Sequence, residues 1–349
     1  MDKIFCENEM AFFEHLSGDR NPLHRQSQYA HRTQFGQIVV YGMYATLFGI
    51  GQWLKGRKCQ LKKIKGEFRK PLVLNECYVL EFVEAASNVE IIYKKSGSIC
   101  LKVKIFFTFE ENFPLPLTNE KFTHDKLKQN ATELSIQNEE IFTIDEPFTY
   151  SANWEAFQSC PINFLLMKHQ LPTVQWNSLL WSTYYVGMEN PGKQALFLSF
   201  DVTFEKEIEQ NEVVFIENIT IKPVPRFNKI IILAKSKGVS AIQLETFHRP
   251  LIIDWSITQV RSIIGRNNIF SSETVLITGA SRGFGAVLAK AFALCGAHVL
   301  LNFNHSKDEA EFIAAEIKSQ GLLCTILQGD ATSAEAWQKI KKKLINDGI

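Results

Sequence analysis

The sequence lacks paired cysteines, long apolar runs and a basic leader. Its seven cysteines are scattered, odd in number and free of any Cys-x-x-Cys pair, which is typical of reduced thiols and not of a disulfide framework or a zinc site. No apolar stretch approaches the ~20 residues that a membrane helix needs. Residues 1–10 do not show the basic-then-apolar pattern of a secretion signal. We therefore expect a cytoplasmic protein with no membrane partner and no metal.

A dominant charge is also absent. Lysine and arginine number 38 against 37 aspartates and glutamates, so global charge does not favour nucleic acid. Positive charge is concentrated in residues 55–70, where Glu67 is the one acid. Two interpretations remain open for this run: a patch that steers an anionic ligand, or the solvated face of a half-buried strand. Its aromatic neighbours Trp53 and Phe68 suit a core, so no nucleic-acid partner is expected.

What the sequence does contain is an internal repeat. Residues 88–109 and 228–248 each hold two β-rich runs around a turn in which glycine follows lysine and serine. Glycine accepts a positive φ at little cost, so both turns are predicted to be hairpins. A long apolar segment precedes each copy, with helical spacing over 43–54 and again over about 174–185. The pattern predicts an α+β protein in which one helix and one antiparallel sheet occur twice. Two unrelated α+β domains are the alternative.

The composition changes along the chain and suggests where units begin. Residues 113–147 are polar with early prolines, as a crossover linker would be. After residue 270 an apolar strand, a glycine turn and an alanine-rich helix follow, which is typical of an α/β unit. The expected division is 1–112 and 141–250 for the repeats, 113–140 and 251–270 for linkers, and 271–349 for the third unit.

Two segments of the first repeat carry chemistry. Residues 17–24 read Ser-Gly-Asp-Arg-Asn-Pro-Leu-His, and residues 35–43 read FGQIVVYGM. Alone, Asp-x-Asn-Pro-x-His would be a turn. Together the segments resemble the active-site stretch of MaoC-like acyl dehydratases and R-specific enoyl-thioester hydratases. The resemblance covers residues 1–110 well and the second repeat more faintly, and it implies a double hot-dog fold.

The resemblance also implies roles for four residues. Asp19 and His24 are the acid/base pair that moves protons during loss or addition of water. Asn21 orients this pair or the water. Gly42 begins the central helix, donates its amide to the thioester oxygen and, lacking a side chain, lets the substrate approach. Which of the two titratable groups acts first depends on pKa values that burial sets, so both orders remain open.

The chain departs from the family pattern at two positions and in its second repeat. Tyr41 stands where the family usually has a histidine, and Gln26 where an acid commonly follows the histidine. We expect an altered substrate lining with activity retained. Between Glu146 and Phe200 there is no aspartate, and His169 is the only histidine. The second repeat is therefore expected to be a degenerate partner that widens the acyl tunnel, with residues 185–192 ending its helix.

The third unit opens like a dinucleotide-binding domain. Residues 274–285 form an apolar strand followed by Thr-Gly-Ala-Ser-Arg-Gly-Phe-Gly, which resembles short-chain dehydrogenases/reductases of the ketoreductase type. A strand at 298–303, a helix at 307–320 and a strand at 322–328 are expected next, which makes an incomplete Rossmann unit. The resemblance assigns cofactor contacts to Gly279, Ser281, Arg282, Gly283, Gly285, Asn304 and Asp330.

No acidic residue stands at the end of the second strand of this unit, where NAD-binding domains use one to bind the ribose 2′-hydroxyl. This absence favours NADP(H) over NAD(H). The family's catalytic serine and Tyr-x-x-x-Lys lie downstream, and the last tyrosine here is Tyr185. We therefore expect no hydride transfer from this segment. The hypothesis is a natural dehydratase–ketoreductase fusion.

The expected function is a hydro-lyase that interconverts 3-hydroxyacyl and trans-2-enoyl thioesters, in fatty-acid-like or polyketide-like metabolism. It needs no cofactor for this step, and its substrate partner is an acyl-carrier protein or a coenzyme A thioester. The alternatives are a hot-dog thioesterase and a non-catalytic acyl-binding scaffold. A double hot dog is complete as one chain or forms a homodimer, and both remain open.

Overall fold

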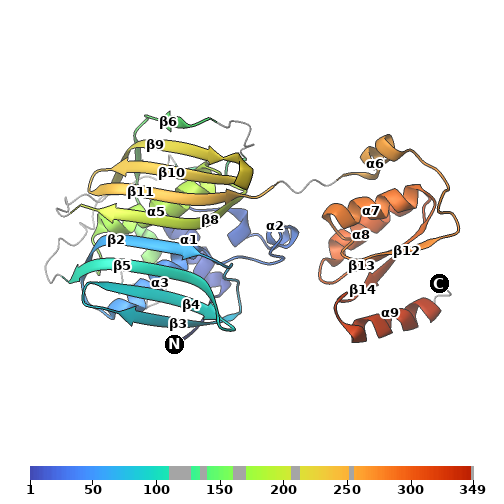
Figure 1. The fold of residues 1–349 in the computed structure, drawn as a ribbon, viewed down its shortest axis with the longest axis horizontal. Helices are drawn as coiled ribbons and strands as arrows, with labels where there is room; N and C mark the ends of the chain where they lie inside the picture. Colours follow the sequence, from blue (N-terminus) through green and yellow to red (C-terminus); the bar gives the residue numbers. More distant parts are fainter. Residues whose placement is uncertain (110–126, 134–139, 160–169, 206–212, 251–254, 347–349) are drawn as a thin grey trace. The chain divides into compact units, whose positions relative to one another are not determined.

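The computed structural model describes residues 1–109, 127–133, 140–159, 170–205, 213–250 and 255–346. The chain divides into two compact units, Met1–Pro250 and Leu251–Ile349 (Figure 1). Cys160, His169 and most of the expected linker 113–140 lie outside the described residues.

The first unit is built on an antiparallel sheet of 11 strands to which both repeats contribute. The first repeat supplies β1 (Asp2–Ile4), β2 (Cys59–Phe68), β3 (Cys77–Glu84), β4 (Asn88–Lys95) and β5 (Ser98–Phe109). The second supplies β6 (Phe142–Ile144), β7 (Phe148–Tyr150), β8 (Ala195–Phe204), β9 (Val214–Val224), β10 (Lys229–Ser236) and β11 (Val239–His248).

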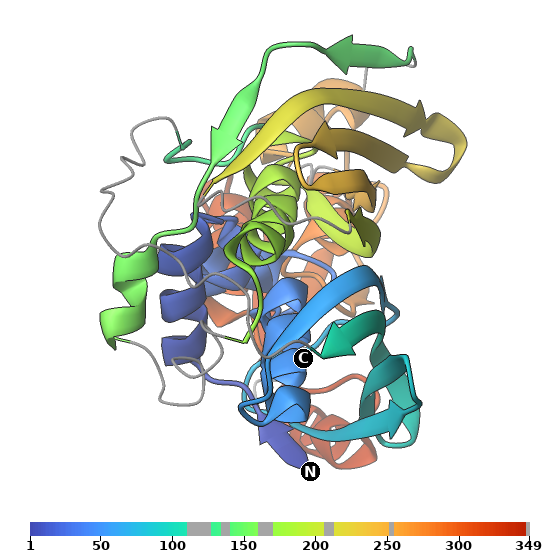
Figure 2. The same ribbon diagram turned by 90° about the vertical axis from the view of Figure 1, so that its left-hand side faces the viewer.

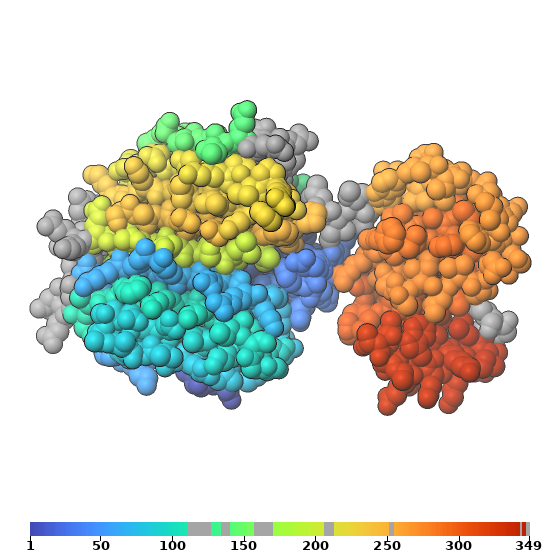
Figure 3. Space-filling view, viewed as in Figure 1, coloured from blue at the N-terminus to red at the C-terminus, as the bar shows by residue number. Residues whose placement is uncertain are grey.

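The strand order carries the signature of duplication. The order is β1-β3-β4-β5-β2-β8-β11-β10-β9-β6. Read outward from the β2–β8 junction, each repeat places its first long strand, its fourth, its third and its second. The hairpin glycines agree, because Gly97 and Gly238 both have φ +75°. Figure 3 shows the two repeats meeting on one continuous outer surface. The predicted repeat of hairpins is confirmed.

Two central helices lie on the same side of this sheet (Figure 2). They are α3 (Gly42–Leu54) and α5 (Thr173–Tyr184), which contact each other. Every residue of α5 is buried, as is nearly all of α3. A helix that is apolar on all sides, such as α3, is stable only when it is enclosed on all sides. The sequence predicted a single buried face for residues 43–54, whereas nearly the whole helix is buried. Helices wrapped by a curled antiparallel sheet, twice over, form a double hot-dog fold.

The first unit also has shorter helices. They are α1 (Glu7–Ser17), η1 (Pro22–His24), α2 (Ser27–Arg32), η2 (Trp154–Ser159), the π-helical turn η4 (Tyr185–Glu189) and η5 (Pro225–Phe227). Among the described helices, none is both long enough and apolar enough to cross a membrane.

The junction between the repeats is polar outside and close-packed inside. On the outer face, Lys63 and Lys65 place their Nζ atoms 3.1 and 2.6 Å from the Asp201 carboxylate. On the inner face, a Cβ at Gly66 would lie 2.1 Å from the Phe200 ring. Glycine at this position therefore lets an aromatic ring of β8 lie flat against β2.

A buried glutamine joins α5 of the second repeat to β2 of the first. The ladder between β2 and β5 shifts register between Leu61 and Lys63. The Gln175 side chain lies beside this irregularity, where its Oε1 accepts the Leu61 N–H at 2.8 Å and its Nε2 donates to the Leu61 carbonyl at 2.7 Å. Gln175 is fully buried. Leu61 pairs with Phe107 of β5, whereas the register of β2 with β8 begins at Lys63, so the Gln175 amide binds the Leu61 backbone where the β8 ladder does not extend.

The second unit is a three-stranded parallel sheet with helices. Its strands β12 (Thr274–Ile277), β13 (His298–Phe303) and β14 (Cys324–Gln328) lie in this order. The helices are α6 (Ile257–Ile264), α7 (Gly283–Leu294), α8 (Lys307–Lys318) and α9 (Ala334–Asn346). The predicted strand–turn–helix–strand order of a partial Rossmann unit is confirmed. In addition, α6 occupies part of the expected linker 251–270, begins with a capping box of Ser256 and Gln259, and packs apolar residues against the core.

We predict that Gln175→Leu destabilises the first unit by roughly 2–4 kcal/mol, because it leaves a buried N–H and a buried C=O of Leu61 without partners. Urea unfolding of the full chain, followed by tryptophan fluorescence, measures the loss. The matched control is Gln243→Leu on the exposed face of β11, which should change stability by less than about 0.5 kcal/mol. Equal effects of the two substitutions would contradict this role of Gln175.

Candidate active site

A pocket opens where both repeats meet beside the start of α3. The first repeat lines it with all of the pocket's charged and titratable groups together with apolar side chains, and the second lines it with Thr183 and with apolar and small residues. Asp19, Asn21, His24 and Gly42, the four residues singled out in the sequence, all line this pocket. Other lining residues include Phe35, Phe68, Arg69, Lys70, Thr183, Val186, Gly187 and Phe197. Asp19 and His24, distinct in chemistry, thus face one cavity.

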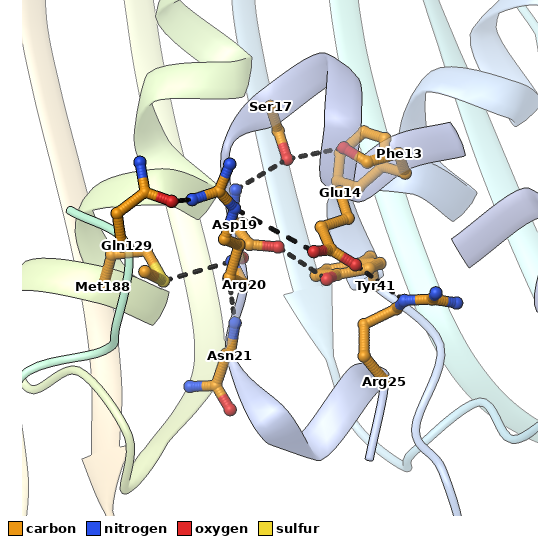
Figure 4. Close-up of polar contacts among 10 residues, drawn as sticks. All are labelled: Phe13, Glu14, Ser17, Asp19, Arg20, Asn21, Arg25, Tyr41, Gln129 and Met188. Atoms are coloured by element: carbon orange, nitrogen blue, oxygen red, sulfur yellow. Dashed lines mark hydrogen bonds and ion pairs between the residues drawn. The ribbon is translucent and has the colours of Figure 1, made fainter. Parts of the chain in front are cut away.

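Asp19 lies in the loop after α1, where Gly18 adopts φ +73° and turns the chain. The loop is fixed at several points (Figure 4): the Asp19 N–H donates to Ser17 Oγ at 3.1 Å, and the Arg20 N–H points at Met188 Sδ at 3.1 Å. The carboxylate is 2% exposed. Its Oδ1 accepts the Asn21 N–H at 3.1 Å, so the loop itself supplies one of the donors.

Burial raises the pKa of Asp19 to about 7. The second donor to this carboxylate, the Thr183 hydroxyl, binds Oδ2 at 2.7 Å. The bonds from Thr183 and from the Asn21 amide oppose the rise, whereas the negative charge of Glu14 adds to it. Near neutral pH the carboxyl therefore exchanges between its acid and its anion, as a proton carrier must.

His24 lies on η1 and is held in one tautomer. Its Nδ1 donates to the Val39 carbonyl at 2.7 Å, which leaves Nε2 with a free lone pair in the neutral ring. Burial lowers the pKa of His24 to about 4; the Val39 bond opposes this shift and the positive charge of Arg249 adds to it. At neutral pH the imidazole is therefore uncharged and has an acceptor nitrogen.

Asn21 uses its side chain to bind backbone. Its Oδ1 accepts the Leu23 N–H at 3.0 Å and so caps η1. Its Nδ2 donates to the carbonyls of Gly187 at 3.2 Å and Gly192 at 2.9 Å. The side chain thus connects the Asp19 loop to the second repeat, while its backbone N–H orients the carboxylate.

Tyr41 contacts both Asp19 and His24. Its hydroxyl donates to the Asp19 carbonyl at 2.6 Å, and its ring lies 4.0 Å from the His24 ring, centroid to centroid. The side chain is fully buried and does not line the pocket. The expectation that Tyr41 alters the substrate lining is therefore wrong for this residue. Its phenol hydroxyl holds the Asp19 loop through the carbonyl of Asp19. A histidine side chain is shorter and would place its donor nitrogen elsewhere.

Gly42 is the first residue of α3. The first amides of a helix have no acceptor within it and carry the positive end of its dipole. A Cβ at this position would lie 2.3 Å from the Phe68 ring. A side chain at Gly42 would therefore displace the Phe68 ring, and both residues line the pocket.

Thr183 and Gly187 are site residues that sequence reasoning missed. A Cβ at Gly187 would lie 2.3 Å from Asp19 Oδ1, so this glycine gives the carboxylate its room. Residues 185–192 were expected to end the helix. The α-helix does end at Tyr184, but a π-helical turn follows, an irregularity often found at functional sites. In the sequence, a threonine within an apolar helix looks like core, and no motif marks it.

The second unit has a glycine-rich turn between β12 and α7. Gly279 and Gly283 have φ of +64° and +54°, where other residues would be strained. A Cβ at Gly285 would lie 2.5 Å from the Gly279 carbonyl, so α7 starts in close contact with the turn. Arg282 has a buried Nη1 with no partner among the described residues.

The remaining candidate contacts lie at the same edge of the sheet. Asp330, after β14, accepts bonds from the N–H and hydroxyl of Thr332 at 2.8 and 2.7 Å. The Asn304 carbonyl, after β13, accepts from Gln328, and Ser281 in the turn is buried. No group of histidine, cysteine and acid side chains able to hold a metal occurs within the described part of the chain.

Comparisons with known proteins cover the two ends of the chain separately. Residues 273–347 match the family model of short chain dehydrogenases, and residues 2–90 match that of the MaoC like domain. Versicolorin reductase 1 of Aspergillus parasiticus is 34% identical over 79 residues, which are 23% of this chain and 30% of that protein. The 3-oxoacyl-(acyl-carrier-protein) reductase of Staphylococcus epidermidis is 32% identical over 75 residues, 22% of this chain and 31% of that protein.

This chain therefore spans about a third of the length of the curated relatives it matches. Among solved structures, a MaoC-like dehydratase from Phytophthora capsici has a TM-score of 0.37 and 10% identity, covering 71% of this chain and 93% of that one. An (R)-hydratase from A. caviae has a TM-score of 0.27 and 23% identity, covering 32% and 92%. The N-terminal end of the chain is thus similar to a MaoC like domain over residues 2–90, and the C-terminal end is similar to a short chain dehydrogenase over residues 273–347.

Proposed function

We propose that the first unit is a hydro-lyase that interconverts 3-hydroxyacyl and trans-2-enoyl thioesters. One observation carries the proposal: the buried carboxyl of Asp19 and the neutral imidazole of His24 line the same pocket, beside the first turn of α3. Elimination of water needs a base for the C2 proton, an acid for the departing hydroxyl and a donor for the enolate oxygen. The pocket offers one group for each task.

The pKa values favour one assignment of the protons. His24 has a pKa lowered to about 4 and a free Nε2, so it is the base that takes the C2 proton. Asp19 has a pKa raised to about 7, so it is the acid that protonates the leaving hydroxyl, which departs as water. In hydration the same two groups exchange roles. One proton is shared by the pair throughout the cycle.

The amide of Gly42 stabilises the enolate. As the C2 proton leaves, negative charge develops on the thioester oxygen, and free amides at a helix start attract such charge. Gly42 opens α3 and lines the pocket. We place the thioester carbonyl against this amide.

The carrier is a phosphopantetheine arm, free as coenzyme A or bound to an acyl-carrier protein. The basic run is divided in the fold: Lys63 and Lys65 pair with Asp201, whereas Arg69 and Lys70 line the pocket. Basic groups at the pocket attract an anionic carrier. The scaffold and thioesterase alternatives use the same pocket but predict other products.

The second unit is proposed to bind NADP(H). The glycine turn leaves backbone amides at the start of α7 free of side-chain cover, which suits a pyrophosphate. The buried, unpartnered Nη1 of Arg282 beside this turn suits a phosphate oxygen. When bound, the nicotinamide supplies hydride chemistry. The residues of this turn hold the phosphates.

Asp19→Asn and His24→Ala should each lower kcat for enoyl-thioester hydration by at least about 10²-fold, because each removes one of the proton carriers. Absorbance of the conjugated enoyl thioester measures the rate. Asp201→Asn on the outer face of the sheet is the matched control and should keep the wild-type rate. Thiol release without enoyl conversion would favour the thioesterase, and binding without turnover would favour the scaffold.

The dependence of kcat/KM on pH should be bell-shaped, with limbs near the pKa of about 4 of His24 and of about 7 of Asp19. Activity requires one proton on the pair: below the lower limb both groups are protonated, and above the upper limb neither is. Initial rates of hydration across pH measure the profile. A rate that keeps rising well above pH 7 would contradict the assignment.

Arg282→Ala should weaken binding of NADPH to the full chain by about 10-fold, because it removes a charge-assisted hydrogen bond to phosphate. Nucleotide fluorescence measures affinity without any turnover. Arg226→Ala, an exposed arginine of the first unit, is the control and should leave affinity unchanged. Unaltered binding in Arg282→Ala, or none in wild type, would refute the proposed cofactor site.

A further inference from the structure

The Asp19 carboxylate is held by a group from the opposite repeat. Thr183 lies in the last turn of α5, and its hydroxyl donates to Asp19 Oδ2 at 2.7 Å. Thr183 is 5% exposed and Asp19 2%, so water does not compete freely for this bond. The first repeat binds the other oxygen, through the Asn21 amide at 3.1 Å. Two donors on two oxygens fix the plane of the carboxylate.

The two donors differ in what they permit. An amide N–H can only donate, so Oδ1 keeps its bond to Asn21 whether or not Asp19 is protonated. A hydroxyl donates or accepts after rotation about one bond. Thr183 can therefore donate to the carboxylate and accept from the carboxylic acid without movement of the backbone. A side chain with this property suits a proton carrier that alternates between the two forms.

We propose that Thr183 is a positioning residue of the acid/base site, through which the second repeat holds Asp19 ready for proton transfer. This inference rests on the proposed hydro-lyase function and deepens it. The second repeat, which has no aspartate or histidine of its own at this place, is then a working part of the single site. Gly187, where a Cβ would lie 2.3 Å from Asp19 Oδ1, supplies the room that the carboxylate needs.

The charged and titratable groups around Asp19 do not replace Thr183. Glu14 of α1 is negative, and Arg25 binds it at 2.7 Å. His24 of η1 is neutral at pH 7, since its pKa is lowered to about 4. Three tyrosines complete the surroundings: Tyr41 before α3, Tyr150 of β7 and Tyr184 of α5, and burial raises the pKa of each far enough to keep it neutral. Thr183 is thus a neutral donor whose removal changes no charge.

The test compares Thr183→Val, which keeps the shape and removes the hydroxyl, with Thr183→Ser, which keeps the hydroxyl. Thr183→Val should lower kcat for hydration roughly 10- to 100-fold, the value of one hydrogen bond to a charged group, with little change in KM. It should also move the alkaline limb of the pH profile upward, because a carboxylate that loses a donor holds its proton more tightly. Thr183→Ser should keep both kcat and the position of the alkaline limb close to those of the wild type.

The matched control is Thr246→Val, because Thr246 is also buried, in β11, and its hydroxyl donates to the Ile230 carbonyl, outside the pocket. It should leave rate and limb unchanged, and circular dichroism reports whether each variant folds. An unshifted limb in Thr183→Val overturns the inference, and so does a Ser variant as impaired as the Val variant, since that result indicates packing alone.

A wild-type protein without hydratase activity would refute the proposed function instead. Carbon NMR of the Asp19 carboxyl then still tests Thr183, because it measures the titration directly. An equal midpoint in wild type and Thr183→Val would overturn the inference on its own, and a higher midpoint in Thr183→Val would support it.

Discussion

The burial of one carboxylate is the constraint on which the site depends. A carboxylate removed from water is costly unless hydrogen bonds satisfy it. Asp19 obtains one donor from its own loop and one from Thr183, 164 positions away in sequence. The same loop is anchored to the second repeat through Asn21. The reactive geometry therefore forms only when both repeats have closed around the two central helices, which couples the site to the fold of the whole first unit.

The duplication is nearly symmetric in the sheet and asymmetric in the pocket. The strand order runs outward in the same sequence from the β2–β8 junction on each side, and both hairpin glycines share φ +75°. In the pocket, the first repeat contributes the titratable groups and the second contributes Thr183, Gly187 and apolar wall. Among its described residues, the second repeat contributes no titratable side chain to the pocket, and it binds the Asp19 carboxylate of the first through Thr183. The two repeats thus share one backbone arrangement but place different kinds of side chain in the pocket.

Much of this could be predicted from sequence, because the signals were local. Turn glycines, apolar helices and the Asp-x-Asn-Pro-x-His segment depend on neighbours in the chain, and they located the hairpins, α3, α5 and the loop of Asp19. Thr183 and Gly187 could not be found in this way, since their importance arises from a contact with Asp19 across the fold. The same holds for Tyr41, whose hydroxyl meets the Asp19 backbone. The residue types in the sequence indicated the chemistry of the site. The residues that hold Asp19 in place could be identified only from the packed structure.

The pocket inverts the usual order of its two titratable groups. A free carboxyl loses its proton before an imidazolium does, yet here burial raises the pKa of Asp19 to about 7 and lowers that of His24 to about 4. Burial disfavours charge on both groups, so near neutral pH the imidazole is uncharged and the carboxyl is divided between its acid and its anion. A neutral pair costs less to enclose in a pocket lined largely by apolar side chains than an ion pair does. In the proposed reaction, charge develops only as the C2 proton moves, and the free amides at the start of α3 are the donors proposed to stabilise it.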